Sequence, residues 1–188
     1  MTGMKTIDIR LKENEVNRLK SLIGRRLESY RHDAFQFTTT STQAVQIDME
    51  GDNPLYLYSF VEPLDYYGSE EDVAVWSFTD EQYPMLKHKE FIRTPVGETI
   101  SNITLVQENQ RLYSGGDQTY DVWVTRGIII DFGDHQIAFE KSIWFSEETG
   151  VHKGYDLIDQ FAPAGDFCND WDEGLRAECD RQLVALAG

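Results

Sequence analysis

The chain has 188 residues, of which 40% are hydrophobic and 27% are charged, as in an ordinary globular domain. Its formal net charge of −16 disfavours nucleic acid and anionic membranes as partners, because like charges repel. No run approaches the roughly 20 apolar residues of a membrane span, and the first residues lack the apolar stretch of a signal peptide. We therefore expect one cytoplasmic domain, residues 1–188, that needs no cofactor to fold.

Charge is distributed unevenly along this sequence. Residues 1–31 contain eight bases and four acids, whereas residues 32–188 contain nine bases and 29 acids and carry a net charge of −20. Residues 147–188 alone hold ten acids against three bases. The acids there that we expect to contact a basic partner are Asp156, Asp159, Asp166, Asp170, Asp172 and Glu173. The alternative is that the acidity only keeps the protein soluble.

The first expected element is a helix of about ten residues that begins near Asn14 and ends at Gly24. From residue 27 to residue 120, alternating apolar and polar residues are typical of strands. The expected strands cover residues 27–39, 43–50, 55–62, 72–79 and 100–107, and turn-forming clusters lie between them, including Thr94-Pro95-Val96-Gly97. Short returns favour antiparallel pairing over alternating strands and helices.

Residues 120–146 are predicted to form two long strands joined by Gly133-Asp134, with glycine in the first position that a type II′ turn prefers. The resulting register makes one face of the hairpin apolar. Its expected pairs on that face are Ile130 with Ile137, Ile128 with Phe139, Val124 with Ile143 and Val122 with Phe145. On the other face the expected pairs include Ile129 with Ala138 and Trp123 with Trp144.

The same register places Arg126 opposite Lys141 on the apolar face, where two like charges should repel. Three explanations are open. Gly127 could permit a β-bulge, the long side chains could reach past the edge of the core, or an acid or bound anion could neutralise them. The first two, purely structural, explanations are favoured because bulges and extended side chains are common.

The end of the chain is predicted to be a polar loop followed by a helix that Asn169 or Asp170 caps. Leu175, Cys179, Leu183 and Leu186 recur in that segment at near-helical spacing. Residues 150–163 could form either a short helix or a last strand. The fold class predicted is therefore α+β, with a mostly antiparallel sheet or partly open barrel between an N-terminal and a C-terminal helix. Cys168 and Cys179 are expected to be reduced thiols.

No complete catalytic motif occurs in the chain. Asp131-Phe132-Gly133 matches the magnesium-binding triplet of protein kinases, but it lacks the accompanying loops and is interpreted as a turn. His135 with Asp131 and Asp134 could offer three metal ligands, yet a solvated histidine is favoured and no metal is predicted. Glu140, which faces Gly127, is the acid whose pKa burial could raise, although an exposed acid is the favoured interpretation.

Two functions follow from these observations. In the first, the acidic surface engages a basic protein and performs no reaction. In size, charge and lack of catalytic motif the chain resembles the immunity proteins of bacterial competition systems, which neutralise basic toxins. In the second, the chain is a small-molecule-binding or enzymatic β-barrel, whose pocket is lined by aromatics such as Trp76, Trp123 and Trp144. Tyr56, Tyr58, Phe60, Tyr66 and Tyr67 could equally fill a core or bind a protein.

Overall fold

The computed structural model describes residues 3–33, 40–41, 44–82, 91–141, 143–169 and 171–187. The strands are β1 (Lys5–Ile9), β2 (Arg26–Asp33), β3 (Thr40–Ser41), β4 (Ala44–Met49), β5 (Leu55–Tyr66), β6 (Ser69–Thr79), β7 (Phe91–Thr99), β8 (Asn102–Ser114), β9 (Asp117–Asp131), β10 (Gln136–Glu140), β11 (Thr149–Gly154) and β12 (Leu175–Ala185). The helices are α1 (Glu13–Lys20) and the 3₁₀ turns η1 (Leu157–Gln160) and η2 (Ala164–Cys168).

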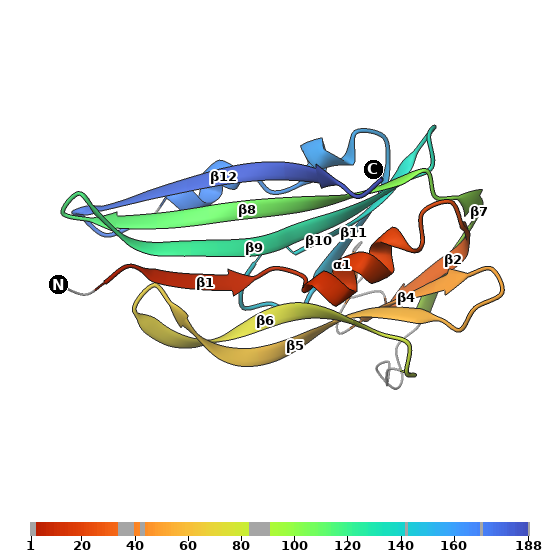
Figure 1. Cartoon of the computed structure of the whole chain (residues 1–188), viewed down its shortest axis with the longest axis horizontal. Coiled ribbons are helices and arrows are strands. Elements are labelled where there is room, and N and C mark those ends of the chain that lie inside the picture. Colours follow the sequence, from red (N-terminus) through yellow and green to blue (C-terminus); the bar gives the residue numbers. More distant parts are fainter. Residues whose placement is uncertain are drawn as a thin grey trace.

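These strands form two sheets that lie one over the other (Figure 1). The larger sheet has the order β12-β8-β9-β10-β11-β3, and β1 pairs in parallel with the first half of β9. The smaller sheet has the order β6-β5-β4-β2-β7. All other pairings are antiparallel, and the sheets do not close into a barrel in the part of the chain described. The antiparallel α+β prediction is thus confirmed in its class, and the barrel alternative is not.

The main core lies between the sheets because each layer has one apolar face to bury. Leu57 and Trp76 from the smaller sheet meet Ile128 and Phe139 from the larger one. Leu19 of α1 joins this cluster, and α1 lies between the two layers in Figure 1. Within the described residues, no helix has the length and apolar character needed to cross a bilayer.

Several of the predicted helices and strands are present but differ from the prediction at their ends. Lys12, not Asn14, precedes the first turn of α1, and its backbone N–H donates to Glu15 Oε2 at 2.7 Å. β8 extends to Ser114, well past the predicted residue 107. Residues 34–39 and 43, at the edges of two predicted strands, lie outside the described residues.

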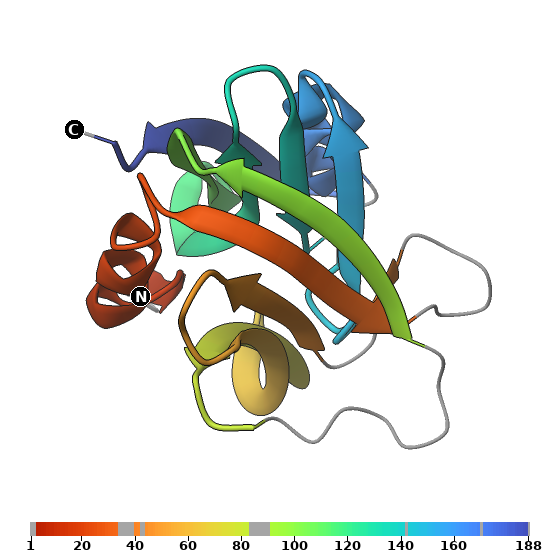
Figure 2. The ribbon, with the colours of Figure 1, turned by 90° about the vertical axis from the view of Figure 1, so that its right-hand side faces the viewer.

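The predicted turn at Thr94-Pro95-Val96-Gly97 is wrong, since β7 runs through it (Figure 2). β7 lies at the edge of the smaller sheet, where proline needs no ladder hydrogen bond. The extra residue of a β-bulge lies in β7 itself, where Val96 and Gly97 together oppose Glu28 of β2, and Gly97 adopts a positive φ there. β1 and β3 were not foreseen at all.

The inner part of the β9–β10 hairpin has the predicted register. Ile130 pairs with Ile137, Ile129 with Ala138 and Ile128 with Phe139. Phe132 N–H donates to His135 O at 3.0 Å across the turn, and Gly133 has a positive φ of 98°. The predicted loop therefore joins the strands as expected.

The outer part of that hairpin is wrong, because β10 ends at Glu140. β1 takes the place of the expected partner and pairs Asp8 with Trp123. Trp144 lies instead in the loop after β10, where its carbonyl accepts a hydrogen bond from Ala74 N–H of β6 at 2.8 Å. Hence Trp123 and Trp144 are not cross-strand neighbours, and the loop covers the free edge of β6.

The C-terminal helix is also wrong: residues 175–185 form β12, which pairs with β8 along its whole length. The near-helical spacing of its leucines is misleading, since Leu183 is 54% exposed. A period of two, in which Arg176, Glu178 and Asp180 alternate with smaller residues, was the better signal. The only helical structure described in this region is short, namely η1 and η2. Residues 150–163, for which the sequence left helix and strand undecided, contain both: they begin in β11 and continue into the 3₁₀ turn η1.

Candidate functional site

The predicted binding acids lie on the segment that connects β11 to β12, residues 155–174, which we call the acidic segment. Residues 154–175 contain six acids and no lysine or arginine. The five described acids are all exposed: Asp156, Asp159, Asp166, Asp172 and Glu173. None of these five forms an ion pair with any residue that the structure describes. Asp170 lies outside the described residues.

Apolar anchors hold the acidic segment against the larger sheet and so display the acids outward. Leu157 and Phe161 are buried and pack on Val106, Ile129 and Ala138. Ala162 N–H donates to Glu140 Oε1 at 2.8 Å. These anchors alternate with the acids along the chain. The segment is therefore held against the sheet at several points, and its carboxylates have defined positions.

The end of the segment is held by an aromatic cluster. The Tyr67 ring packs edge-on against Trp171 at 5.1 Å and also contacts Tyr120 and Phe167. Burial raises the pKa of Tyr67 far above its usual value, so its hydroxyl stays neutral and donates to Gln110 Oε1 at 3.2 Å. Of the tyrosine group singled out in the sequence, Tyr56 and Tyr67 are therefore packing residues.

Several bases of the N-terminal region, by contrast, pair with acids of the same chain. Arg18 pairs with Asp80 at 2.6 Å, Arg25 pairs with Asp52 at 2.6 Å, and Lys5 pairs with Asp65. These exposed pairs contribute little stability, but they cancel charge locally. The unbalanced negative charge of the molecule is thus concentrated elsewhere, and the acidic segment is one place where it is found.

A cavity of about 220 Å³ opens beside the acidic segment. Asp166 and Phe167 of that segment contribute to its wall, together with Tyr66 and Trp144. Two further wall residues, Ile143 and Phe145, are 56% and 46% exposed. Exposed apolar side chains around a hollow with acids nearby have the composition of a protein-binding surface, in which apolar contacts lie inside a polar rim.

Glu108 lies at the buried end of this cavity and binds two arginines. Its Oε1 accepts from Arg181 Nη2 at 2.6 Å, and its Oε2 lies 3.3 Å from Arg126 Nε. Gln110 Nε2 also donates to Oε2 at 3.1 Å. Arg181 Nη2 donates in addition to Ala162 O at 2.6 Å, so the network connects β8, β9 and β12 to the acidic segment.

The structure shows how Arg126 and Lys141 can lie close together although both carry positive charge. The β8–β9 register shifts between Val106 and Gln107, so that Arg126 is an extra residue in β9 and forms the bulge that had been considered. Glu108 supplies the neutralising acid. The bulge and the acid therefore act together, and both Arg126 and Lys141 are nevertheless buried.

The charged form of Lys141 is destabilised by its position in this arrangement. Burial and the nearby Arg126 lower its pKa from 10.5 to about 8. Its ammonium donates to Ser146 O at 3.3 Å and lies 5.8 Å from the centre of the Trp76 ring. The difference in pKa corresponds to about 3 kcal/mol of unfavourable free energy when the charged form is buried.

We expect Lys141→Met to raise the free energy of unfolding by about 1–3 kcal/mol at pH 7, because an apolar side chain of similar length avoids this cost. Between about pH 8 and 10.5 the unfolded wild-type chain binds a proton that the folded chain does not. Wild-type stability should therefore rise through that window relative to the variant. Urea unfolding of both proteins from pH 7 to 10.5 checks this, and parallel curves would refute it.

Glu140 does not have the raised pKa considered for a working acid. Burial alone would raise it, but hydrogen bonds from His152 Nε2 at 2.8 Å and from Ala162 N–H outweigh burial and lower the pKa of Glu140. Glu140 faces Gly127 as expected, and it anchors the acidic segment. The partnership with His152 was not foreseen because the two residues meet across the β10–β11 pair, which the sequence did not indicate.

The three tryptophans do not line one pocket. Trp144 lines the cavity beside the acidic segment, whereas Trp123 lines a separate groove of about 620 Å³ under α1. Trp76 is buried in the main core and donates to Thr149 Oγ1 at 3.2 Å. No described cavity therefore brings the three tryptophans together, and Trp123 and Trp144 line separate hollows.

The two cysteines are free thiols in the structure. Cys168 is exposed in η2, and Cys179 lies on β12 instead of on a helix. Burial and the neighbouring Glu108 raise the pKa of the Cys179 thiol to about 12, so it stays protonated and unreactive at neutral pH.

Comparison with protein-family models, with curated proteins and with solved structures gave no match to this chain. What the chain does must therefore be inferred from its own side chains. Glu108 and Arg181 are the important residues that sequence reasoning missed. Only a correct strand assignment for residues 108–114 and 175–185 would have placed them together.

Proposed function

We propose that the protein binds a basic protein partner through the acidic segment and catalyses no reaction. One observation carries this proposal: five exposed carboxylates on a well-anchored segment have no cationic partner among the described residues. Surface acids that served solubility alone would not need to gather on one such segment.

The surroundings of the segment support the same proposal. The exposed Ile143 and Phe145 beside Asp166 provide apolar contact area that a purely solubilising surface does not need. A partner that presents an apolar side chain flanked by lysines or arginines would match both features. The resemblance to immunity proteins in size and charge makes a basic toxin the first partner to test.

A second candidate function is small-molecule binding in the cavity that Trp144 lines. The observation in its favour is a hollow of about 220 Å³ with buried polar groups of Glu108 and Gln110 at its wall. A neutral ligand there would quench or shift the fluorescence of Trp144 and would bind with little dependence on salt. These properties separate the two functions.

The test of the first function is neutralisation of the acidic segment by Asp→Asn and Glu→Gln at its six acids. The variant and the wild type are immobilised and exposed to a lysate of the source cells at low and high salt. We expect the wild type to retain basic proteins at low salt and the variant to lose most of them, because attraction between the charges steers and holds the partner.

The matched control removes six other exposed acids, so that net charge falls equally in both variants. Suitable residues are Glu28, Glu50, Glu70, Glu71, Glu81 and Asp117, none of which forms an ion pair with a described residue. Equal loss in both variants would assign binding to net charge alone. Recovery of only neutral or acidic partners would contradict the proposal.

A further inference from the structure

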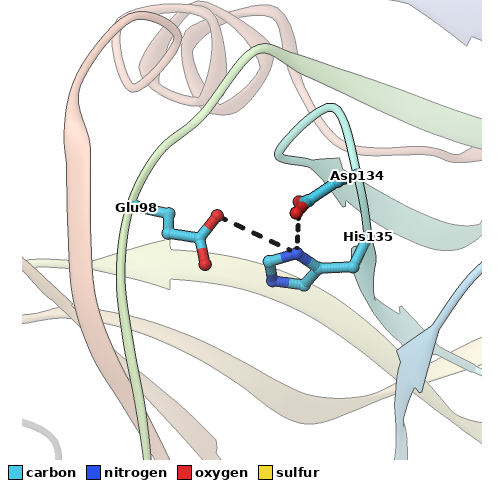
Figure 3. A group of neighbouring side chains, drawn as sticks. All are labelled: Glu98, Asp134 and His135. Carbon is cyan, nitrogen blue, oxygen red and sulfur yellow. Dashed lines mark hydrogen bonds and ion pairs between the residues drawn. The ribbon is translucent and has the colours of Figure 1, made fainter.

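Three metal-ligating side chains converge at the tip of the β9–β10 hairpin, away from the acidic segment. They are Glu98, Asp134 and His135, and their ligand atoms lie within 4.8 Å of one another. Figure 3 shows both carboxylates turned toward the same ring nitrogen of His135. Asp134 Oδ1 lies 2.7 Å from His135 Nδ1, and Glu98 Oε2 lies 3.9 Å from it.

The three side chains come from both sheets. Glu98 belongs to β7 at the edge of the smaller sheet, whereas Asp134 and His135 belong to the hairpin of the larger one. The trio considered from the sequence included Asp131, but the fold puts Glu98 in its place. That exchange adds a ligand from a second element, which a hairpin tip by itself cannot supply.

The hairpin tip is fixed by interactions that leave the three ligands available. Asp131 Oδ1 accepts from Gly133 N–H at 2.7 Å, and Asp131 Oδ2 accepts from Gln136 Nε2 at 2.8 Å. The Phe132 ring stacks on the imidazole of His135 with centres 4.9 Å apart. Asp131 thus orients the turn, and Phe132 orients the ring, in the manner of residues that support metal ligands.

Negative charge is in excess at this hairpin tip, which favours binding of a cation. Neither Glu98 nor Asp134 pairs with a lysine or arginine of the described chain, so two carboxylates share one imidazole. A divalent ion would neutralise both. An ion about 2.0–2.2 Å from each ligand separates neighbouring ligand atoms by roughly 3–3.5 Å, and the two observed distances bracket this range.

We propose that Glu98, Asp134 and His135 bind a zinc ion that links the two sheets, with water at the remaining position. One imidazole nitrogen and two carboxylates suit zinc, whereas calcium takes six to eight oxygens and magnesium prefers an oxygen octahedron. The ion would join β7 to the hairpin tip. Zinc should therefore stabilise the folded chain by an amount that grows with the logarithm of zinc concentration once this exceeds the dissociation constant.

The test titrates untagged, chelator-treated full-length protein with zinc chloride by calorimetry, with Cys168→Ser as background because zinc also binds exposed thiolates. We expect one zinc per chain and a rise in Tm with zinc concentration. His135→Ala should lower the affinity by more than about tenfold, since even the loss of a supporting residue has an effect of that size. Calcium at the same concentration should not bind.

The charge control compares two double variants. Glu98→Gln with Asp134→Asn should abolish binding, whereas Glu70→Gln with Glu71→Gln removes the same charge from β6, outside the acidic segment, and should leave binding unchanged. In the cobalt-loaded protein, the visible spectrum should also change when His135 is replaced. A wild type that binds no zinc, or that binds it equally without His135, would overturn the proposal, as would equal loss in the two double variants.

Discussion

Gly127→Ala is expected to lower the free energy of unfolding by about 3 kcal/mol or more. A Cβ at this position would lie 2.0 Å from Cε2 of the Phe161 ring, a distance that real side chains do not reach. Alanine gains up to about 1 kcal/mol over glycine in a strand interior, so the clash should outweigh this gain. Because Phe161 anchors the acidic segment, the segment should shift as well.

Chemical denaturation of Gly127→Ala and of Gly165→Ala measures this effect. A Cβ on Gly165 would have open space around it, so that variant should differ from wild type by less than about 0.5 kcal/mol. In a Phe161→Leu background the effect of Gly127→Ala should shrink, because the smaller side chain can move aside. Wild-type stability in Gly127→Ala would show that the ring does not lie over the glycine.

Glu108→Ala is expected to destabilise the protein by about 3–5 kcal/mol. The carboxylate is only 2% exposed and balances Arg126 and Arg181, whose side chains are 9% and 17% exposed. Without it, the Arg126 and Arg181 guanidinium groups would lose the carboxylate that both contact in a poorly hydrated place, and Arg126 would still repel the buried Lys141. This loss of stability comes from the buried positive charges that remain, and it is larger than the net free energy that the ion pairs contribute.

Two comparisons isolate that cause by denaturation at pH 7. Asp180→Ala breaks a partly exposed pair with Arg111 on the same two strands, in which Asp180 is 60% exposed, and should cost less than about 1 kcal/mol. Replacing Glu108, Arg126 and Arg181 together by Leu, Met and Leu should recover most of the stability, because no charge is then left unpaired. Equal losses in Glu108→Ala and Asp180→Ala would rule out the buried network as described.

The sequence predicted structure best where turn chemistry and alternation agreed. Gly133-Asp134 gave the register of β9 and β10 correctly for the residues nearest the turn, and the alternation over residues 55–62 and 72–79 located β5 and β6. Both signals are local. The prediction failed where β1 displaced the expected partner of Trp123, since a parallel pairing between distant segments leaves no local trace.

The residues of the candidate sites also differ in whether the sequence could predict them. The acids of residues 156–173 could be named from composition because a charge excess is visible in the sequence itself. Glu108 could not be named, because its arginines come from β9 and β12 and only the sheet order brings the three together. Glu98 likewise meets His135 only because the two sheets approach at the hairpin tip.

The central claim is that the acidic segment attracts a basic partner, and the dependence of the association rate on salt tests it most directly. The Debye length falls from about 30 Å at 0.01 M to about 8 Å at 0.15 M ionic strength. The association rate constant of the captured partner should therefore fall steeply across this range for wild type and for the control with six other acids removed. It should be low and nearly independent of salt for the variant with a neutral acidic segment. An association rate that does not change with salt in the wild type, or a neutral-segment variant that behaves like wild type, would contradict the claim.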